Sequence, residues 1–273
     1  MDEKKFIDVE NLIASKNPKL LRRLPRFVIK YLKRILHQNE INSFISKNKT
    51  KKNSDWCDAV VEYMNISITV KNIEKIPENG KIVLAMNHPL GGMDAMILIS
   101  ALKDRRSDLQ FIVNDLLMNL ESMSDMFVGV DKHGKNKGSL KDQITKLFSS
   151  DKAVCIFPAG LVSRKIGNEV KDLVWKKTFV TYSKKHDRTI IPIYIDGKLS
   201  NFFYRLSKFR KFIGIKANIE MLYLSNELFK QKNRRMSFVV GDPISESLLN
   251  SSKNDAIIAE KIKEKVYELR SQL

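Results

Sequence analysis

Cysteine and long apolar stretches are both scarce in this chain of 273 residues. The two cysteines, Cys57 and Cys155, lack the spacing of a metal site, and Cys155 lies in an apolar stretch where a free thiol packs as a small hydrophobic group. No apolar stretch approaches the roughly 18 residues of a membrane-spanning helix, and the first residues lack the apolar core of a signal peptide. We therefore expect a reduced, cytoplasmic protein without a bound metal or resident cofactor.

Several common catalytic motifs are also missing from the chain. No Gly-x-Ser-x-Gly motif occurs, which excludes a serine hydrolase of the nucleophile-elbow type. Neither a Walker motif nor a glycine-rich dinucleotide-binding motif is present. The length and the 43% hydrophobic content allow one large domain, or one domain with an appendage.

What the sequence does contain is a regular alternation of strand-like and helical patterns. The expected strands cover 66–70, 82–86, 109–113, 126–130, 153–157, 190–195, 217–224 and 237–240. The expected helices cover 95–102, 140–148, 173–185, 200–212 and 255–269. This alternation predicts an α/β fold with a mainly parallel or mixed sheet flanked by helices. A polar stretch near Asn53 suggests a boundary between an N-terminal helical segment, residues 1–53, and one α/β domain, residues 54–273.

Positive charge is concentrated in the N-terminal segment. The chain has a formal net charge of +18, and residues 1–53 contribute +9 of it, from fourteen Lys and Arg and five Asp and Glu. From Arg26 onward an apolar stripe and a basic stripe recur at helical spacing. Such a helix is typical of membrane-surface segments, although a helix packed on its own domain with a solvated basic face gives the same pattern. We favour an anionic membrane surface as the partner, and the predicted contact residues are Arg26, Phe27, Lys30, Tyr31, Lys33 and Arg34.

The most informative segment joins a predicted strand to a predicted helix. The apolar stretch 82–86 ends just before His88, the chain turns through two glycines, and Asp94 precedes the apolar stretch 95–102. Open α/β sheets form their sites at the carboxyl ends of strands. There an imidazole can take a proton from a hydroxyl, while a carboxylate fixes its tautomer. Alternatively, Asp94 caps the helix and His88 is an ordinary loop residue.

Three further blocks follow this His/Asp block along the chain. A predicted strand ends near Lys132, a later one runs into Phe157-Pro-Ala-Gly-Leu-Val-Ser-Arg164, and 189–195 is a β-rich run with an internal proline. In this order, the four blocks resemble those of the PlsC-like glycerolipid and lysophospholipid acyltransferase superfamily. The similarity is strongest to its divergent, haemolysin-named branch, and it extends over roughly residues 70–245.

The resemblance implies an O-acyltransferase in which His88 and Asp94 form a general-base pair. The acyl group would move from an acyl thioester, acyl-CoA or acyl-carrier protein, to the hydroxyl of a lyso-lipid. Such an enzyme of phospholipid biosynthesis would lie peripherally on the inner face of the cytoplasmic membrane. The implied substrate-binding residues are Asn87, Pro89, Gly91, Lys132, Phe157, Pro158, Ala159, Gly160, Ser163 and Arg164.

Two departures from the family pattern bear on the substrate. Five residues separate His88 from Asp94 where the family has four, and the glycine turn between them is flexible enough to absorb the extra residue. Ala159 and Val162 replace the family's Glu and Arg, and an arginine appears only at Arg164. A valine cannot bind a phosphate monoester as a guanidinium does. The acceptor is therefore either a 1-acylglycerol-3-phosphate bound by the shifted Arg164 or, as we favour, a lyso-aminolipid such as an N-acylated amino acid with a free hydroxyl.

Two other functions account for part of the sequence only. The charge also suits a nucleic-acid-binding protein, but no recognition motif is present, and we do not expect nucleic acid as a partner. A non-catalytic, membrane-binding relative would explain Ala159, but not the presence of both His88 and Asp94.

The aromatic and basic segment 200–212 suits either a second membrane-surface patch or a helix with its phenylalanines in the core, and core packing is favoured. Its expected core residues are Phe202, Leu206 and Phe209.

Overall fold

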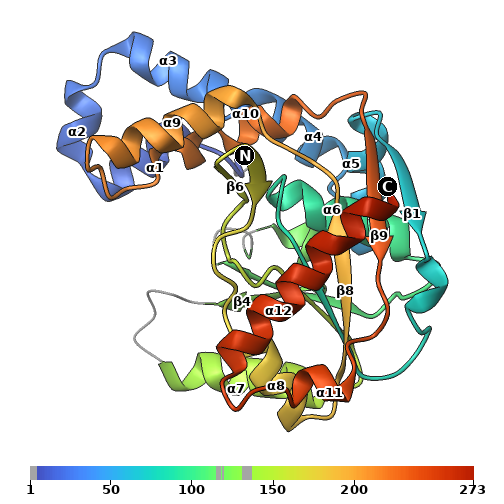
Figure 1. The fold of residues 1–273 in the computed structure, drawn as a ribbon. Coiled ribbons are helices and arrows are strands. Elements are labelled where there is room, and N and C mark those ends of the chain that lie inside the picture. The colour runs from blue at the N-terminus through green and yellow to red at the C-terminus, as the bar shows by residue number, and fades with distance from the viewer. Residues whose placement is uncertain (1–4, 115–117, 119, 131–136) are drawn as a thin grey trace. The chain divides into compact units, whose positions relative to one another are not determined.

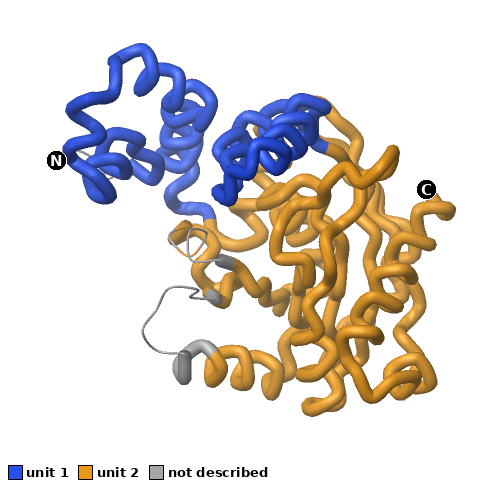
Figure 2. Tube along the Cα trace, turned by 60° about the vertical axis from the view of Figure 1, so that its left-hand side comes forward, with its two compact units in different colours: residues 1–51, 199–232 blue, residues 52–198, 233–273 orange. Residues whose placement is uncertain are grey.

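The computed structural model describes residues 1–273 except 1–4, 115–117, 119 and 131–136. It divides into two compact units, shown in different colours in Figure 2. Unit 1 comprises residues 1–51 and 199–232, and unit 2 comprises 52–198 and 233–273. The expected boundary at Asn53 therefore lies close to one observed boundary. The segment 199–232, which was expected inside the α/β domain, belongs instead to unit 1.

Unit 2 is built on a seven-stranded mixed sheet, in the order β1-β9-β8-β2-β5-β3-β4. All neighbouring strands are parallel except β8 and β9, which are antiparallel. The expected α/β class is confirmed. The strands are β1 (Ser67–Lys71), β2 (Ile82–Met86), β3 (Leu109–Asn114), β4 (Phe127–Val130), β5 (Ala153–Ile156), β8 (Thr189–Ile195) and β9 (Arg235–Val240).

Helices cover both faces of this sheet (Figure 1). The chain runs from β2 through α6 to β3, and it returns in the opposite direction from β4 through α7 to β5 and from β5 through α8 to β8. Because parallel crossovers are right-handed, α6 covers one face while α7 and α8 cover the other. The helices of unit 2 are α5 (Asn53–Tyr63), α6 (Gly92–Leu102), α7 (Lys137–Ser149), α8 (Thr178–Lys185), α11 (Glu246–Leu249) and α12 (Asp255–Glu268).

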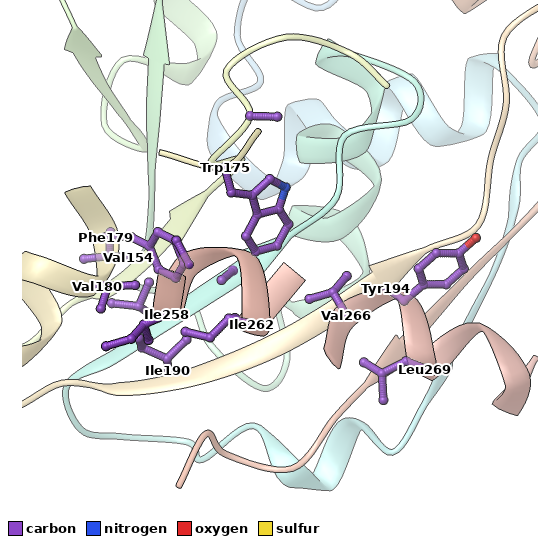
Figure 3. Packing of buried hydrophobic residues seen from close by; sticks show 14 of the residues in the cluster. Val154, Trp175, Phe179, Val180, Ile190, Tyr194, Ile258, Ile262, Val266 and Leu269 are labelled. Carbon is purple, nitrogen blue, oxygen red and sulfur yellow. The ribbon is translucent and has the colours of Figure 1, made fainter. Parts of the chain in front are cut away.

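A large apolar cluster fills the space between the sheet and α7, α8 and α12 (Figure 3). Alternate residues of β2, Val83 and Ala85, point into it, because successive side chains of a strand face opposite sides. The remaining residues of β2 are also fully buried, so this strand is covered on both faces, as expected for the centre of a parallel sheet. The ends of β2 are therefore fixed by packing from both sides.

Unit 1 is helical throughout its regular elements in the described residues. Within it, the hydroxyls of Tyr31 and Tyr223 lie 2.7 Å apart, and the ring of His37 stacks on Phe229 with centroids 4.0 Å apart. His37 is thus a packing residue. The elements are α1 (Val9–Lys16), α2 (Pro18–Arg23), α3 (Arg26–Ile35), α4 (Gln38–Lys47), α9 (Asn201–Phe212), η4 (Ile219–Tyr223) and α10 (Leu224–Phe229). In the described part of the chain, every helix is too short or too polar to cross a bilayer.

Several sequence expectations differ from the structure. The helix expected over 173–185 begins only at Thr178, as α8. Residues 217–224, expected as a strand, form the turn η4 and the start of α10. Phe202 and Phe209, expected in the core, are 48% and 58% exposed, while the neighbouring Phe203 is buried. An antiparallel hairpin, β6 (Arg164–Ile166) with β7 (Glu169–Lys171), was not expected at all. Its strands have three residues each, too short for a two-residue periodicity to stand out.

Candidate active site

The site lies where the two central parallel strands β2 and β5 end. The two strands are neighbours in register, with Ala85 beside Ile156, so their carboxyl ends lie side by side. From there the chain leaves β2 towards α6 and leaves β5 towards α8, on opposite faces of the sheet. Such a divergence opens a crevice at the edge of an α/β sheet, which is where these folds bind ligands.

His88 and Asp94 are in contact just beyond the carboxyl end of β2. Nδ1 of His88 and Oδ2 of Asp94 are 3.0 Å apart, and the Leu90 amide donates to the same carboxylate oxygen at 2.9 Å. The turn between them passes through Gly91 at φ 77°, ψ −141°, a conformation that side-chain-bearing residues rarely adopt. The longer spacing is therefore accommodated at Gly91. Asp94 lies in the first turn of α6, but the N-cap of this helix has no side-chain hydrogen bond, so Asp94 pairs with His88 and does not cap the helix.

The two members of the pair occupy different environments. Asp94 is completely buried, whereas the His88 side chain is 17% exposed. Burial raises the pKa of the Asp94 carboxyl, and the hydrogen bond from His88 acts in the opposite direction. If Nδ1–H of His88 donates to Asp94, the lone pair lies on Nε2. His88 is then oriented as a base at an accessible position.

The loop after β5 packs directly on this pair. The rings of His88 and Phe157 stack with centroids 4.1 Å apart at 25°. Pro158 and Ala159 are buried, and Gly160, at φ 65°, is exposed at the end of the turn. The apolar wall beside His88 thus comes from Phe157, and the only exposed residue of this turn has no side chain.

Asp172 was not identified from the sequence, yet it joins the two loops. Its carboxylate accepts hydrogen bonds from the backbone amide of His88 (3.2 Å), Ser163 Oγ (2.6 Å) and Trp175 Nε1 (2.9 Å). Ser163 in turn donates its backbone N–H to the His88 carbonyl at 2.8 Å. Asp172 follows a polar, Lys- and Glu-containing hairpin, and nothing in that pattern distinguishes a buried carboxylate from a solvated one. Trp175, three positions later, was the one available signal.

The remaining predicted substrate-binding residues are largely engaged with the protein itself. Both polar atoms of the Asn87 amide bond to the backbone of Ile195, at 2.9 and 2.7 Å, which joins the ends of β2 and β8. Arg164 is 5% exposed, and Nη1 donates to the Val162 carbonyl at 2.6 Å. Pro89 is buried in the His88 loop. Lys132 lies outside the described residues. Contacts of these residues with a substrate stay predictions.

The predicted membrane-contacting residues all lie on α3 in unit 1. Arg26, Lys30 and Arg34 are exposed, together with Phe27 at 74% and Tyr31 at 39%. Lys33 instead forms an ion pair with Glu10 of α1. The apolar stripe is divided, because Ile35 is buried while Phe27 and Tyr31 face solvent. Among the described residues, no group of three or more His, Cys, Asp or Glu side chains is arranged to hold a metal ion.

Three known proteins are similar to this chain over nearly its whole length. A relative from Phocaeicola vulgatus, a lyso-glycine lipid O-acyltransferase, is 39% identical over 265 residues, covering 97% of this chain and 95% of its own. A lyso-glycine lipid O-acyltransferase from Bacteroides thetaiotaomicron is 38% identical over 265 residues, covering 97% of each chain. The crystal structure of the 1-acyl-sn-glycerophosphate acyltransferase PlsC from Thermotoga maritima is 18% identical with a TM-score of 0.48, over 97% of this chain and 95% of that one.

The match to the family itself extends over nearly the whole sequence. The family model described as acyltransferase matches residues 11–273, which includes both loops of the site. The resemblance drawn from the sequence blocks is therefore confirmed, and this chain belongs to the acyltransferase family.

Proposed function

We propose that this protein transfers a fatty acyl group from an acyl thioester to the hydroxyl of a lyso-lipid, and that its acceptor is a lyso-glycine lipid or a closely related lyso-aminolipid. The observation that carries the proposal is the contact of His88 with the buried Asp94 at the carboxyl end of β2. Two relatives that carry the name lyso-glycine lipid O-acyltransferase, at 39% and 38% identity, support the acceptor class.

The chemistry follows from the orientation of His88. Nε2 takes the proton from the acceptor hydroxyl as its oxygen attacks the thioester carbonyl, and Asp94 stabilises the imidazolium that forms. The tetrahedral intermediate then collapses, the carbon–sulfur bond breaks, and the thiolate receives the proton from His88. A positioned general base contributes on the order of 10²- to 10⁴-fold to the rate. Backbone amides of the strand-end loops are suited to stabilise the oxyanion.

The loop after β5 supports an acceptor without a phosphate monoester. Val162, at the position of the family's arginine, is 1% exposed and apolar, so it offers a head group neither charge nor a hydrogen bond. Arg164 donates a hydrogen bond to the Val162 carbonyl, so the guanidinium charge of Arg164 lies next to this loop. An amino-acid head group carries a single carboxylate, which needs less positive charge than a phosphate monoester does. We therefore assign the carboxylate of the acceptor to the neighbourhood of Arg164.

The donor and the location complete the proposal. Acyl-CoA and acyl-carrier protein both present a thioester, and both suit the reaction. The exposed basic residues of α3 favour peripheral attachment to an anionic membrane, which we propose is the inner face of the cytoplasmic membrane. The acceptor would then be taken from the bilayer to which the enzyme is attached.

A competition assay tests the acceptor. Purified enzyme would receive one acyl-CoA or acyl-carrier-protein donor and equal amounts of lyso-glycine lipid and lysophosphatidic acid in detergent micelles. Mass spectrometry of the products should show a preference for lyso-glycine lipid of roughly ten- to a hundredfold, the size of one charge-assisted contact. A preference for lysophosphatidic acid that is lost in Arg164→Ala, but kept in the neighbouring Lys165→Ala, would show instead that Arg164 restores the phosphate site.

A further inference from the structure

The end of α9 and the loop that follows it expose an unusual amount of apolar surface. Phe209 is 58% exposed, Phe212 is 88%, Ile213 is 47% and Ile215 is 38%. Exposed apolar side chains are ordinary when scattered singly, but here four are concentrated within seven positions. We call this segment, residues 208–216, the α9 tip.

The α9 tip is held in shape by a buried ion pair. Nε of Arg210 donates to Glu220 at 2.8 Å, and Nη1 donates to the backbone carbonyls of Ile215 (2.8 Å) and Lys216 (3.4 Å). Ser207 also donates to Glu220, at 3.2 Å. Arg210 and Glu220 are 6% and 0% exposed. Hydrogen bonds from Arg210 to the loop carbonyls therefore hold the loop against α9, while the apolar side chains of the loop are exposed.

The charge around the tip has one sign. No acidic residue occurs between Asp196 and Glu220, a stretch that contains six Lys and Arg. Arg210 is neutralised by Glu220, whereas Lys208, Lys211 and Lys216 are exposed beside the apolar side chains. A segment that combines exposed aromatic and aliphatic side chains with three exposed lysines complements the headgroup and upper acyl region of an anionic bilayer.

We propose that the α9 tip inserts into the anionic membrane and is, together with α3, the membrane-docking surface of unit 1. The two are linked within the unit, because Phe202 of α9 packs edge-on against Tyr223, whose hydroxyl contacts Tyr31 of α3. The tip supplies apolar insertion and α3 supplies mainly charge. This inference rests on the proposed function only in taking the lyso-lipid to reside in a bilayer.

The test uses the full-length protein and vesicles of phosphatidylcholine with or without phosphatidylglycerol. Both native tryptophans, Trp56 and Trp175, are buried, so a tryptophan placed at the tip reports on its own surroundings. The fluorescence of the new tryptophan in Phe212→Trp should be quenched by lipids brominated on their acyl chains, and only when phosphatidylglycerol is present. Ile257→Trp, at a 48% exposed position of α12, is the matched control and should not be quenched.

Affinity gives the second measurement. Phe212→Ala should lower the affinity for phosphatidylglycerol vesicles by about tenfold, the effect of one large apolar side chain that no longer leaves water. Ile257→Ala should leave it unchanged. Turnover on a lyso-lipid in detergent micelles should be the same for both variants, so failure of the docking proposal and failure of the acyltransferase proposal are separated.

Three outcomes would overturn the inference. The first is an unquenched Phe212→Trp in protein that sediments with the vesicles. The second is self-association, measured by analytical ultracentrifugation, that Phe212→Ala abolishes, which would make a second copy of the chain the occupant. The third is tighter binding to single-stranded nucleic acid than to the vesicles, weakened by Phe212→Ala.

Discussion

The His88 loop and the α9 tip place their distinctive side chains in opposite environments. Asp94 is completely buried and shares its carboxylate between His88 and the Leu90 amide, whereas Phe212 is 88% exposed. In the loop, burial fixes the orientation of the polar groups, and the accessible group is the imidazole of His88. In the tip, the buried ion pair of Arg210 with Glu220 supports the backbone, and apolar groups are exposed.

This difference separates two kinds of dependence. Residues that act by orientation in a buried site change the rate of the chemical step, and salt screens them little. Residues that act by charge and apolar area on a surface change how much enzyme is bound to the membrane, and they respond to salt and lipid composition. The variants of the site and of α3 should therefore fall into two groups that do not overlap. The predictions follow in order of decreasing expected effect.

After loss of the base His88 itself, the largest effect is expected for Asp94→Asn. An amide cannot stabilise an imidazolium as a carboxylate does, and its NH₂ group can select the wrong His88 tautomer, so kcat should fall on the order of 10²- to 10⁴-fold. Thiol release with a micellar lyso-lipid acceptor measures this at low and high salt alike. Asp242→Asn, at a surface position whose side chain is 83% exposed, is the control and should keep the wild-type rate. A folded Asp94→Asn enzyme with a near-normal kcat would remove Asp94 from the chemistry.

Charge reversal on α3 should act on binding alone. Each basic residue near an anionic surface contributes about 1 kcal/mol, so Arg26, Lys30 and Arg34 changed together to Glu should weaken vesicle binding by about a hundredfold or more. The loss should shrink as salt rises, and turnover in micelles should not change. The control is the change of Lys141, Lys185 and Lys265, exposed on α7, α8 and α12, to Glu, which alters the net charge by the same amount. If wild-type protein stays free of anionic vesicles at low salt, α3 is only a packing helix.

Asp172→Asn should give an intermediate effect on the rate. Asp172 accepts from three donors, and the amide nitrogen of Asn would face one of them without a partner. An unsatisfied buried polar group costs about 1–3 kcal/mol of stability, and the displaced His88 backbone should lower kcat by about tenfold to a hundredfold. Urea unfolding and steady-state kinetics would be measured on the same sample. A loss of stability without any change in kcat would make Asp172 a structural residue only.

The smallest effect is expected from the two adjacent glycines of the turn. Gly91→Ala forces a side chain into a conformation that costs about 1–3 kcal/mol, because its φ is 77°. Gly92, the first residue of α6, has open space at the position of a Cβ, so Gly92→Ala should be neutral or slightly stabilising. Thermal unfolding of the two variants compares them directly. Equal melting temperatures would show that the turn relaxes and that Gly91 is not required by its conformation.

Much of the sheet was predictable because its central strands are short, apolar and bounded by turns. The stretch 82–86 was predicted with the bounds of β2, and the contact of His88 with Asp94 followed from a strand end next to a helix start. The prediction of a strand over residues 217–224 was wrong for a physical reason. Their apolar composition suits a strand, but Glu220 is drawn into the interior by Arg210, and a turn forms around that pair.

Two other features had little or no local signal in the sequence. Residues 199–232 join unit 1 although 147 residues of unit 2 separate them from residue 51, and only long-range contacts define such a unit. Asp172 acts through its distance to His88 and Ser163, which come from other loops. A pattern of neighbours in sequence cannot identify a buried carboxylate whose partners are brought to it by the fold.

The most direct test of the account is the rate of acyl transfer by His88→Ala beside His186→Ala. His186 precedes β8 at its amino end, so it lies at the opposite edge of the sheet from the site. With lyso-glycine lipid in micelles and one acyl thioester donor, His88→Ala should lose acyl transfer by at least two to four orders of magnitude, the contribution of a general base. His186→Ala should retain it. Wild-type turnover by a folded His88→Ala enzyme would contradict the assignment of His88 as the base.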